Sequence, residues 1–118
     1  SKSNFLILGL SFKENSSDLR NSKSIELANM IYKNINKKIY GFDKFVNENH
    51  NKFIKLINIE KLYLKFYDVI IIMHNSDYLK KLDWKHLSLN SRIILDLRNI
   101  LNKNKQIDIK KTFDITML

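Results

Sequence analysis

The chain contains no cysteine and no proline, and only two of its 118 residues are glycine. The lack of cysteine excludes disulfide bonds, metal sites built on thiolates and a cysteine nucleophile within this chain. A chain without disulfides is compatible with a reducing compartment, so we expect it in the cytoplasm. Its chemistry must come from charged, hydroxyl, amide and imidazole side chains.

The scarcity of glycine excludes a common cofactor site. Gly9 follows a short apolar run, and the next glycine in the sequence is Gly41. A conventional dinucleotide-binding turn has the pattern G-x-G-x-x-G, because the backbone must approach the pyrophosphate closely at several points. We therefore expect that this chain does not bind NAD in the usual way by itself.

Long hydrophobic runs are also missing. The longest lies around Val69–Met73, far short of the ~20 residues that span a bilayer. The first four residues lack the apolar segment of a signal peptide and lead directly into a strand-like stretch, which predicts that the sequence begins at the boundary of a fragment. We expect no membrane partner.

The formal net charge of +9 by itself suggests a polyanionic partner such as nucleic acid or phosphate. Most of this charge comes from 18 lysines, against only three arginines. Asparagine and isoleucine are also abundant, a joint bias typical of AT-rich genomes. A solvated lysine surface is the simpler interpretation, because net charge concerns solubility more than fold. We expect no nucleic-acid partner, and we regard the three arginines as the more informative cations.

The apolar pattern predicts strands alternating with amphipathic helices. Short apolar runs predict strands at Phe5–Leu10, Lys38–Asp43, Asp68–Met73 and Arg92–Leu97. Helical spacing and capping residues predict a helix from Lys23 capped by Ser22, a short one over Ile59–Phe66 capped by Asn58, and one over Asp77–Leu89 that restarts at Asp83. We expect a mixture of loop and helix over residues 45–55, and we assign no role to residues 102–118.

This alternation is typical of a Rossmann-like doubly wound α/β fold, with a mainly parallel sheet and helices on both faces. Hydrophobic residues make up 44% of the chain, enough for a core, and 118 residues fit one folding unit. We therefore predict a single domain over residues 1–118.

Ligands of doubly wound folds bind at the carboxyl ends of the strands, near the point where the strand order reverses. Lys13, Arg20 and Arg98 lie in connections that follow predicted strands. If these three cations converge, they form a diphosphate site, in which arginine supplies a two-pronged donor and lysine a point charge. The alternative is that the arginines pair with nearby Asp18 or Asp96, and spacing alone does not decide between the two.

Other candidate sites are weaker. The histidines at positions 50, 74 and 86 have no metal-ligand spacing, so we predict no metal site. Glu14 and Asp18 lie four residues apart in a loop, where capping or pairing with arginine is more common than paired-acid chemistry. Trp84 falls at a core-like helical position, and we expect it to pack in the core rather than to stack on a base.

The segment LGLSFKENSSDLRNS at residues 8–22 resembles the start of the UDP-binding domain of the UDP-glucose/GDP-mannose dehydrogenase family. In that family a Gly-Leu-x-Phe-Lys stretch is followed by Asp-x-Arg and by a helix that a serine leads. Lys23 and Lys44 stand where many relatives have proline, so Ser22 alone remains to start the helix. The similarity continues at residues 24–27, 40–43, 67–71, 82–84 and 94–99.

The family's enzymes oxidise the C6 hydroxyl of a nucleotide sugar to a carboxylate in two NAD-dependent steps. The resemblance implies that Phe12, Lys13 and Arg98 contact a UDP-sugar, and that Arg20 approaches NAD. It places the main NAD site and the catalytic cysteine in parts of the enzyme before this segment, so this chain holds no catalytic residue and is expected to be inactive alone. The resemblance also implies that the enzyme has an amino-terminal NAD-binding domain and a central helical domain. It further implies a homo-oligomer and a role in surface polysaccharide synthesis.

Two other functions fit parts of the sequence. One is a stand-alone basic module that binds nucleic acid, whose affinity would fall steeply with salt. The other is a receiver-like signalling domain, because Asp43 ends a predicted strand and Lys13 follows another. The sequence lacks the acidic cluster after the first strand that would hold Mg²⁺ in such a domain.

Overall fold

The computed structural model describes residues 4–11, 13, 17–48, 51–101 and 112–113. Its elements are, in chain order, β1 (Asn4–Leu8), α1 (Lys23–Ile35), β2 (Lys38–Phe42), β3 (Lys55–Leu56), α2 (Ile59–Leu62), β4 (Tyr67–Ile72), α3 (Asp77–Lys80), α4 (Trp84–Leu89), β5 (Ser91–Asp96) and β6 (Thr112–Phe113). None of the helices within these residues is long and apolar enough to cross a membrane.

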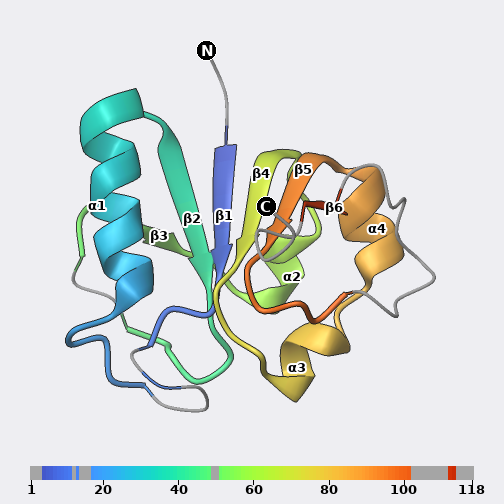
Figure 1. Ribbon diagram of the computed structural model, residues 1–118, viewed down its shortest axis with the longest axis horizontal. Helices are drawn as coiled ribbons and strands as arrows, with labels where there is room; N and C mark the ends of the chain where they lie inside the picture. Colours follow the sequence, from blue (N-terminus) through green and yellow to red (C-terminus); the bar gives the residue numbers. More distant parts are fainter. Residues whose placement is uncertain (1–3, 12, 14–16, 49–50, 102–111, 114–118) are drawn as a thin grey trace.

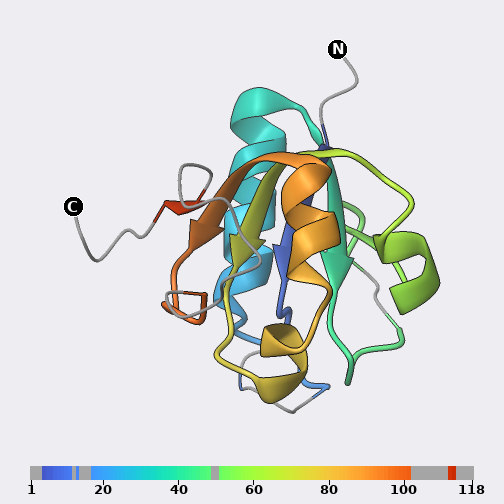
Figure 2. The same cartoon turned by 90° about the vertical axis from the view of Figure 1, so that its right-hand side faces the viewer.

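The strands form one parallel sheet of six strands in the order β3-β2-β1-β4-β5-β6. In its centre Leu6 of β1 lies beside Ile70 of β4, and Ile7 beside Ile71. Helix α1 covers one face, whereas α2, α3 and α4 lie on the other, and Figure 2 shows α1 and α4 on opposite sides of the strands. The predicted Rossmann-like doubly wound fold is confirmed.

Helix α1 begins where the sequence predicted. The Ser22 hydroxyl accepts a hydrogen bond from the Ile25 amide at 3.2 Å, and Asn36 ends the helix in the left-handed conformation. Ala28 and Ile31 of α1 are buried against the sheet. They belong to a core cluster on this face, which also contains Ile7, Leu10, Ile39, Ile54 and Ile71.

The other face carries the larger core cluster, built around the completely buried Trp84 and Tyr67. The Trp84 indole donates to the Leu79 carbonyl at 2.8 Å, which confirms that this side chain packs in the core. The Tyr67 hydroxyl donates to the Leu62 carbonyl at 2.7 Å, and burial raises the pKa of this phenol. The predicted restart at Asp83 is also confirmed, because its carboxylate accepts from the His86 amide.

Several boundaries differ from the predictions. The first strand ends at Leu8 rather than Leu10, because the positive φ of +91° at Gly9 turns the chain. The predicted helix over Ile59–Phe66 stops at Leu62, and Phe66 is half exposed. Within residues 45–48 and 51–55 there is no helix, contrary to the expected mixture. Strand β3 was not predicted, because its two residues are too few to show an alternating pattern.

Candidate functional site

The direction of the connections reverses between β1 and β4. From β1 the chain passes to α1 and β2 on one side of the sheet, and from β4 it passes to α3, α4 and β5 on the other side. Figure 1 shows the carboxyl ends of both strands at the lower edge of the molecule, together with the loops that follow them. This is the place at which doubly wound folds bind ligands.

The loop after β1 is fixed at its start by the first turn of α1. The Gly9 amide donates to the Phe42 carbonyl at 2.9 Å, as a continuation of the sheet. The Ser24 hydroxyl donates to the Gly9 carbonyl, and the Ser22 hydroxyl donates to the Leu10 carbonyl. The same serine that starts α1 therefore also anchors the loop.

Asp43, immediately after β2, binds the same loop through its carboxylate. Its Oδ2 accepts from the Leu10 amide at 2.8 Å and from the Ser11 amide at 3.2 Å, while Oδ1 accepts from the Phe45 amide at 3.0 Å. The side chain is 1% exposed. A phosphoacceptor aspartate must be accessible, so the burial of Asp43 argues against a receiver-like function.

His74, which follows β4, completes the arrangement. One imidazole nitrogen, Nε2, lies 2.9 Å from the Ser11 carbonyl and carries the proton in this contact, because a carbonyl oxygen only accepts. The other, Nδ1, lies 3.9 Å from Oδ2 of Asp43 and has no hydrogen-bond partner among the described residues. The ring packs against Gly9 so closely that a Cβ atom there would lie 2.4 Å from its Cγ.

Lys13 lies two residues beyond this anchored segment and is exposed. The Ser11 hydroxyl donates to the Lys13 carbonyl, so the anchoring reaches the backbone of Lys13. Phe12, the other substrate-binding residue that the resemblance implies in this loop, lies outside the described residues.

Arg98, just after β5, is exposed, and its Nη1 lies 3.4 Å from the Met73 carbonyl. The carboxylate of the buried Asp96 holds the turn after β5, where it accepts from the Ile100 and Leu101 amides. Met73 directly precedes His74, which binds the loop of Lys13. The anchored loop that leads to Lys13 and the side chain of Arg98 therefore contact adjacent residues at the carboxyl end of β4.

Arg20 pairs with Asp18, which is the alternative to a diphosphate site that the sequence left open. Its guanidinium binds the Asp18 carboxylate through two hydrogen bonds of 3.0 Å, and these lower the pKa of Asp18. The pair borders a hollow of about 340 Å³ that residues 17–20 share with residues 46–48, which follow β2. Arg20 thus borders the loop after β2, whereas Arg98 and the loop start before Lys13 contact residues at the end of β4.

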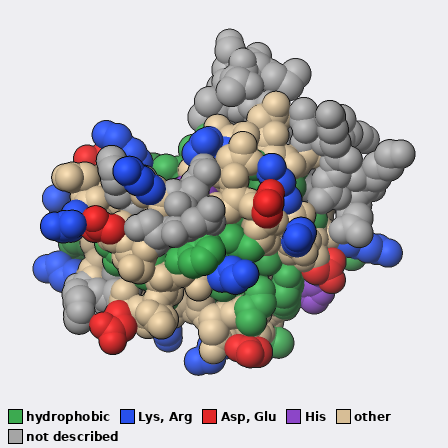
Figure 3. All heavy atoms as spheres, turned by 90° about the horizontal axis from the view of Figure 1, so that it is seen from below, with side chains coloured by type: hydrophobic (Ala, Val, Ile, Leu, Met, Phe, Trp, Pro, Cys, Tyr) green, Lys and Arg blue, Asp and Glu red, His purple; other side chains and the backbone are tan. Residues whose placement is uncertain are grey.

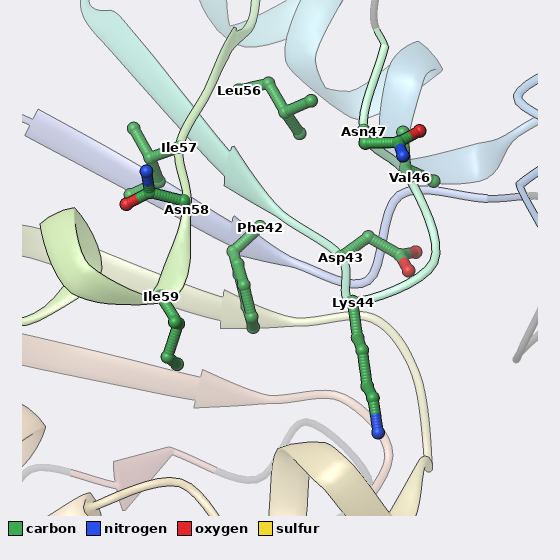
Figure 4. Close-up of a pocket in the computed structure, with 9 residues that line it drawn as sticks. All are labelled: Phe42, Asp43, Lys44, Val46, Asn47, Leu56, Ile57, Asn58 and Ile59. Atoms are coloured by element: carbon green, nitrogen blue, oxygen red, sulfur yellow. The ribbon is translucent and has the colours of Figure 1, made fainter.

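A larger hollow of about 440 Å³ lies beside the carboxyl ends of β2 and β3. Figure 4 shows Ile57, Asn58 and Ile59 on one side of it and Val46 and Asn47 on the other. Sequence reasoning missed this hollow, because it depends on β3 and on the course of residues 45–55.

Figure 3 looks onto this edge of the molecule and shows lysine and arginine side chains interspersed with acidic ones, around a hydrophobic area. Among the described residues, no group of three or more His, Asp or Glu side chains could hold a metal ion. On this face the described cations are separated by acidic, apolar and other side chains and do not form a continuous basic patch.

Sequence reasoning did not predict that Asp43 and His74 would anchor the loop. The turn at residues 73–77 follows a strand end, but His74 entered the sequence analysis only as a rejected metal ligand, and Asp43 entered only through the receiver-like alternative. The sequence did offer one signal for such residues, namely a polar residue just after a buried strand, at the edge of the sheet where the loops converge. That signal places both residues at the edge but does not identify their partners.

Several known proteins are similar to this chain. A model described as the UDP-glucose/GDP-mannose dehydrogenase family, UDP binding domain, matches residues 6–103. Protein CapL of Staphylococcus aureus is 33% identical over 107 residues, which cover 84% of this chain and 24% of CapL. The UDP-glucose 6-dehydrogenase of Rickettsia prowazekii is 34% identical over 110 residues, which cover 84% of this chain and 24% of that enzyme.

A solved structure gives the same fold. The UDP-D-ManNAc dehydrogenase of Pyrococcus horikoshii superposes with a TM-score of 0.74 and 24% identity, over 98% of this chain and 26% of that one. The chain therefore spans about a quarter of the length of the relatives that it matches. From the matched family model and the identity to its curated members, the chain belongs to the UDP-glucose/GDP-mannose dehydrogenase family, as its UDP-binding domain.

Proposed function

We propose that this domain binds the UDP-sugar substrate of an NAD-dependent nucleotide-sugar 6-dehydrogenase, which oxidises the sugar C6 hydroxyl to a carboxylate. The family match carries this proposal, and relatives named UDP-glucose 6-dehydrogenase and UDP-N-acetyl-D-mannosamine dehydrogenase support it. Lys13 and Arg98 are the proposed diphosphate ligands. Their connections follow β1 and β5, the strands on either side of β4, so both cations can serve one diphosphate near the end of that strand.

NAD does not fit the first turn of this domain in the conventional way. The turn has the single glycine Gly9, and the amides of Leu10 and Ser11 are bonded to Asp43 rather than open to a pyrophosphate. We therefore assign the main NAD site to another part of the enzyme, with Arg20 reaching the cofactor from this domain. The hollow that Arg20 borders is lined by residues of the loop after β2 and by none at the end of β4, which supports this division of roles.

We infer the wider setting from the same family. The coverage of about a quarter of each relative leaves room for an amino-terminal NAD-binding domain and a central helical domain in one homo-oligomeric cytoplasmic enzyme. Surface polysaccharide synthesis is the pathway class that would use the resulting sugar acid. Titrating the full-length enzyme with UDP, GDP and UDP-sugars tests the substrate class, and the proposal requires that UDP binds more tightly than GDP.

Lys13→Ala in the full-length enzyme is expected to weaken UDP binding by roughly ten-fold to a hundred-fold, since a charge-assisted contact is worth about 1.5–3 kcal/mol. Isothermal titration calorimetry measures this loss directly. Lys55→Ala is the matched control, because Lys55 is an exposed lysine in β3. Equal, negligible effects of both substitutions would show that the loop after β1 has only a structural role.

Arg20→Ala is expected to raise the KM for NAD and to leave the KM for the UDP-sugar close to its original value. Steady-state kinetics with each substrate varied in turn separates the two constants. Arg92→Ala is a suitable control, because Arg92 is also exposed and lies 3.7 Å from Asp68, near the amino end of β5. An effect confined to the UDP-sugar KM would contradict the role of Arg20 at the cofactor.

A further inference from the structure

The backbone of Gly9, Leu10 and Ser11 is fully paired, although it lies in a loop. The contacts described above account for all three amides and all three carbonyls of this segment. Their partners come from the end of β2, the start of α1 and the end of β4. Loop backbone at a protein edge usually bonds to water, so a fully paired segment indicates a fixed conformation.

Asp43 and His74 hold the part of this segment nearest to Lys13. A buried imidazole with an unpartnered nitrogen costs stability that an apolar side chain of similar size would not cost. A buried carboxylate likewise requires all of its bonding partners. Core packing alone therefore does not explain these two residues, whereas their shared contact with Ser11 does.

We propose that Asp43 and His74 are positioning residues that set the place of Lys13 at the substrate site by fixing the backbone of Ser11. This inference rests on the proposed function, in which Lys13 binds the UDP diphosphate. The connection runs from His74 and Asp43 to the Ser11 peptide groups, and from the Ser11 hydroxyl to the Lys13 carbonyl. A lysine on a flexible stem loses less freedom on binding when its backbone is already fixed.

Two substitutions of His74 separate positioning from simple packing. The amide nitrogen of glutamine occupies nearly the place of the imidazole Nε2, so His74→Gln keeps a donor for the Ser11 carbonyl. Asparagine is too short to reach it. In the full-length enzyme, His74→Asn is expected to weaken UDP binding by about ten-fold, and His74→Gln by about two-fold or less.

Asp43→Asn tests the other anchor at nearly constant volume. A carboxylate has two accepting oxygens, one for the loop amides and one for the Phe45 amide, whereas asparagine has a single accepting oxygen. In Asp43→Asn, either the loop amides of Leu10 and Ser11 or the Phe45 amide then faces the NH₂ group of asparagine, which cannot accept a hydrogen bond. We expect a loss of UDP affinity of about ten-fold, as for His74→Asn.

Combination with Lys13→Ala decides whether the two residues act through Lys13. If they do, His74→Asn and Asp43→Asn cause no further loss of UDP affinity once Lys13 is alanine, because the positioned group is gone. Additive losses would overturn the inference. If either substitution prevents folding, Ser11→Ala takes its place, since it removes the hydroxyl that contacts the Lys13 carbonyl and, at 3.4 Å, Oδ2 of Asp43, with an expected loss of roughly three-fold.

His86→Asn is the matched control, because His86 also contacts a backbone carbonyl, that of Tyr63, at 2.8 Å. It should lower the unfolding midpoint and leave the UDP affinity unchanged. If Lys13→Ala itself leaves UDP binding intact, the proposed function of Lys13 is wrong. If Lys13→Ala weakens binding while the substitutions of Ser11, Asp43 and His74 do not, the inference about positioning is wrong and the proposed function stands.

Discussion

Gly9→Ala is expected to lower the free energy of unfolding by about 3 kcal/mol or more, since two independent costs act at this position. The first is the backbone conformation, with a φ of +91° that alanine rarely adopts. The second is the close approach of His74, whose Cγ and Cβ would lie 2.4 Å and 2.8 Å from the new Cβ. Urea denaturation followed by circular dichroism measures the change.

Gly41→Ala provides the comparison. A Cβ at Gly41 would meet methyl groups of Ile54 and Leu10 at 2.8–2.9 Å, and Gly41 has no positive φ. The Leu10 methyl groups end a flexible side chain, whereas the Ile54 methyl is attached to the branched Cβ and yields less easily. Because no strained φ adds to these contacts, the expected cost is smaller than at Gly9. Adding His74→Ala to Gly9→Ala should recover at least about 1 kcal/mol relative to the sum of the single changes, because the 2.4 Å contact with Cγ disappears, while the contact with Cβ and the strained φ remain. Strictly additive changes would show that the imidazole does not press on Gly9.

Trp84→Ala is expected to cost about 3–5 kcal/mol, a large share of the stability of a domain of this size. Trp84 is the single tryptophan and is fully buried in the larger core cluster. Its removal leaves a large cavity and takes the indole hydrogen bond from the Leu79 carbonyl. Urea denaturation must be followed by circular dichroism, since the variant has lost its tryptophan fluorescence.

Two further substitutions help to interpret the loss of stability in Trp84→Ala: one removes only part of the side chain, and the other is a control on the same helix. Trp84→Phe keeps an aromatic ring but loses the N–H donor, and we expect it to cost about 1–3 kcal/mol. Leu89→Ala, at the exposed end of α4, should change the stability by less than about 0.5 kcal/mol. An equal effect of Trp84→Ala and Leu89→Ala would mean that the core on this face is not closely packed.

The main elements could be predicted because each carries its own local signal. The run of β-branched residues from Val69 to Ile72 identifies a strand buried in the sheet, and Ser22 with the spacing of Ala28 and Ile31 identifies α1. Strand β3 carries no such signal. Its two residues join the sheet only because β2 is already there to pair with them.

The candidate site was predictable to a smaller extent. Topology alone places Lys13, Arg20 and Arg98 in loops at the carboxyl edge, and the roles proposed for them come from the family resemblance. The contacts of these residues depend on distances between elements, which spacing in the sequence does not contain. Arg20 could pair with Asp18 because the two are neighbours, but the contact between His74 and Ser11 joins residues 63 positions apart.

That separation also affects the order in which the domain forms. The bonds from Asp43 and His74 to the loop span 32–33 and 63 residues, so they cannot form before β2 and β4 have docked beside β1. A partly folded chain could contain α1 and yet lack the conformation of the loop after β1. A ligand that recognises this loop would then bind only the folded domain, and its concentration would shift the thermal midpoint of unfolding upwards.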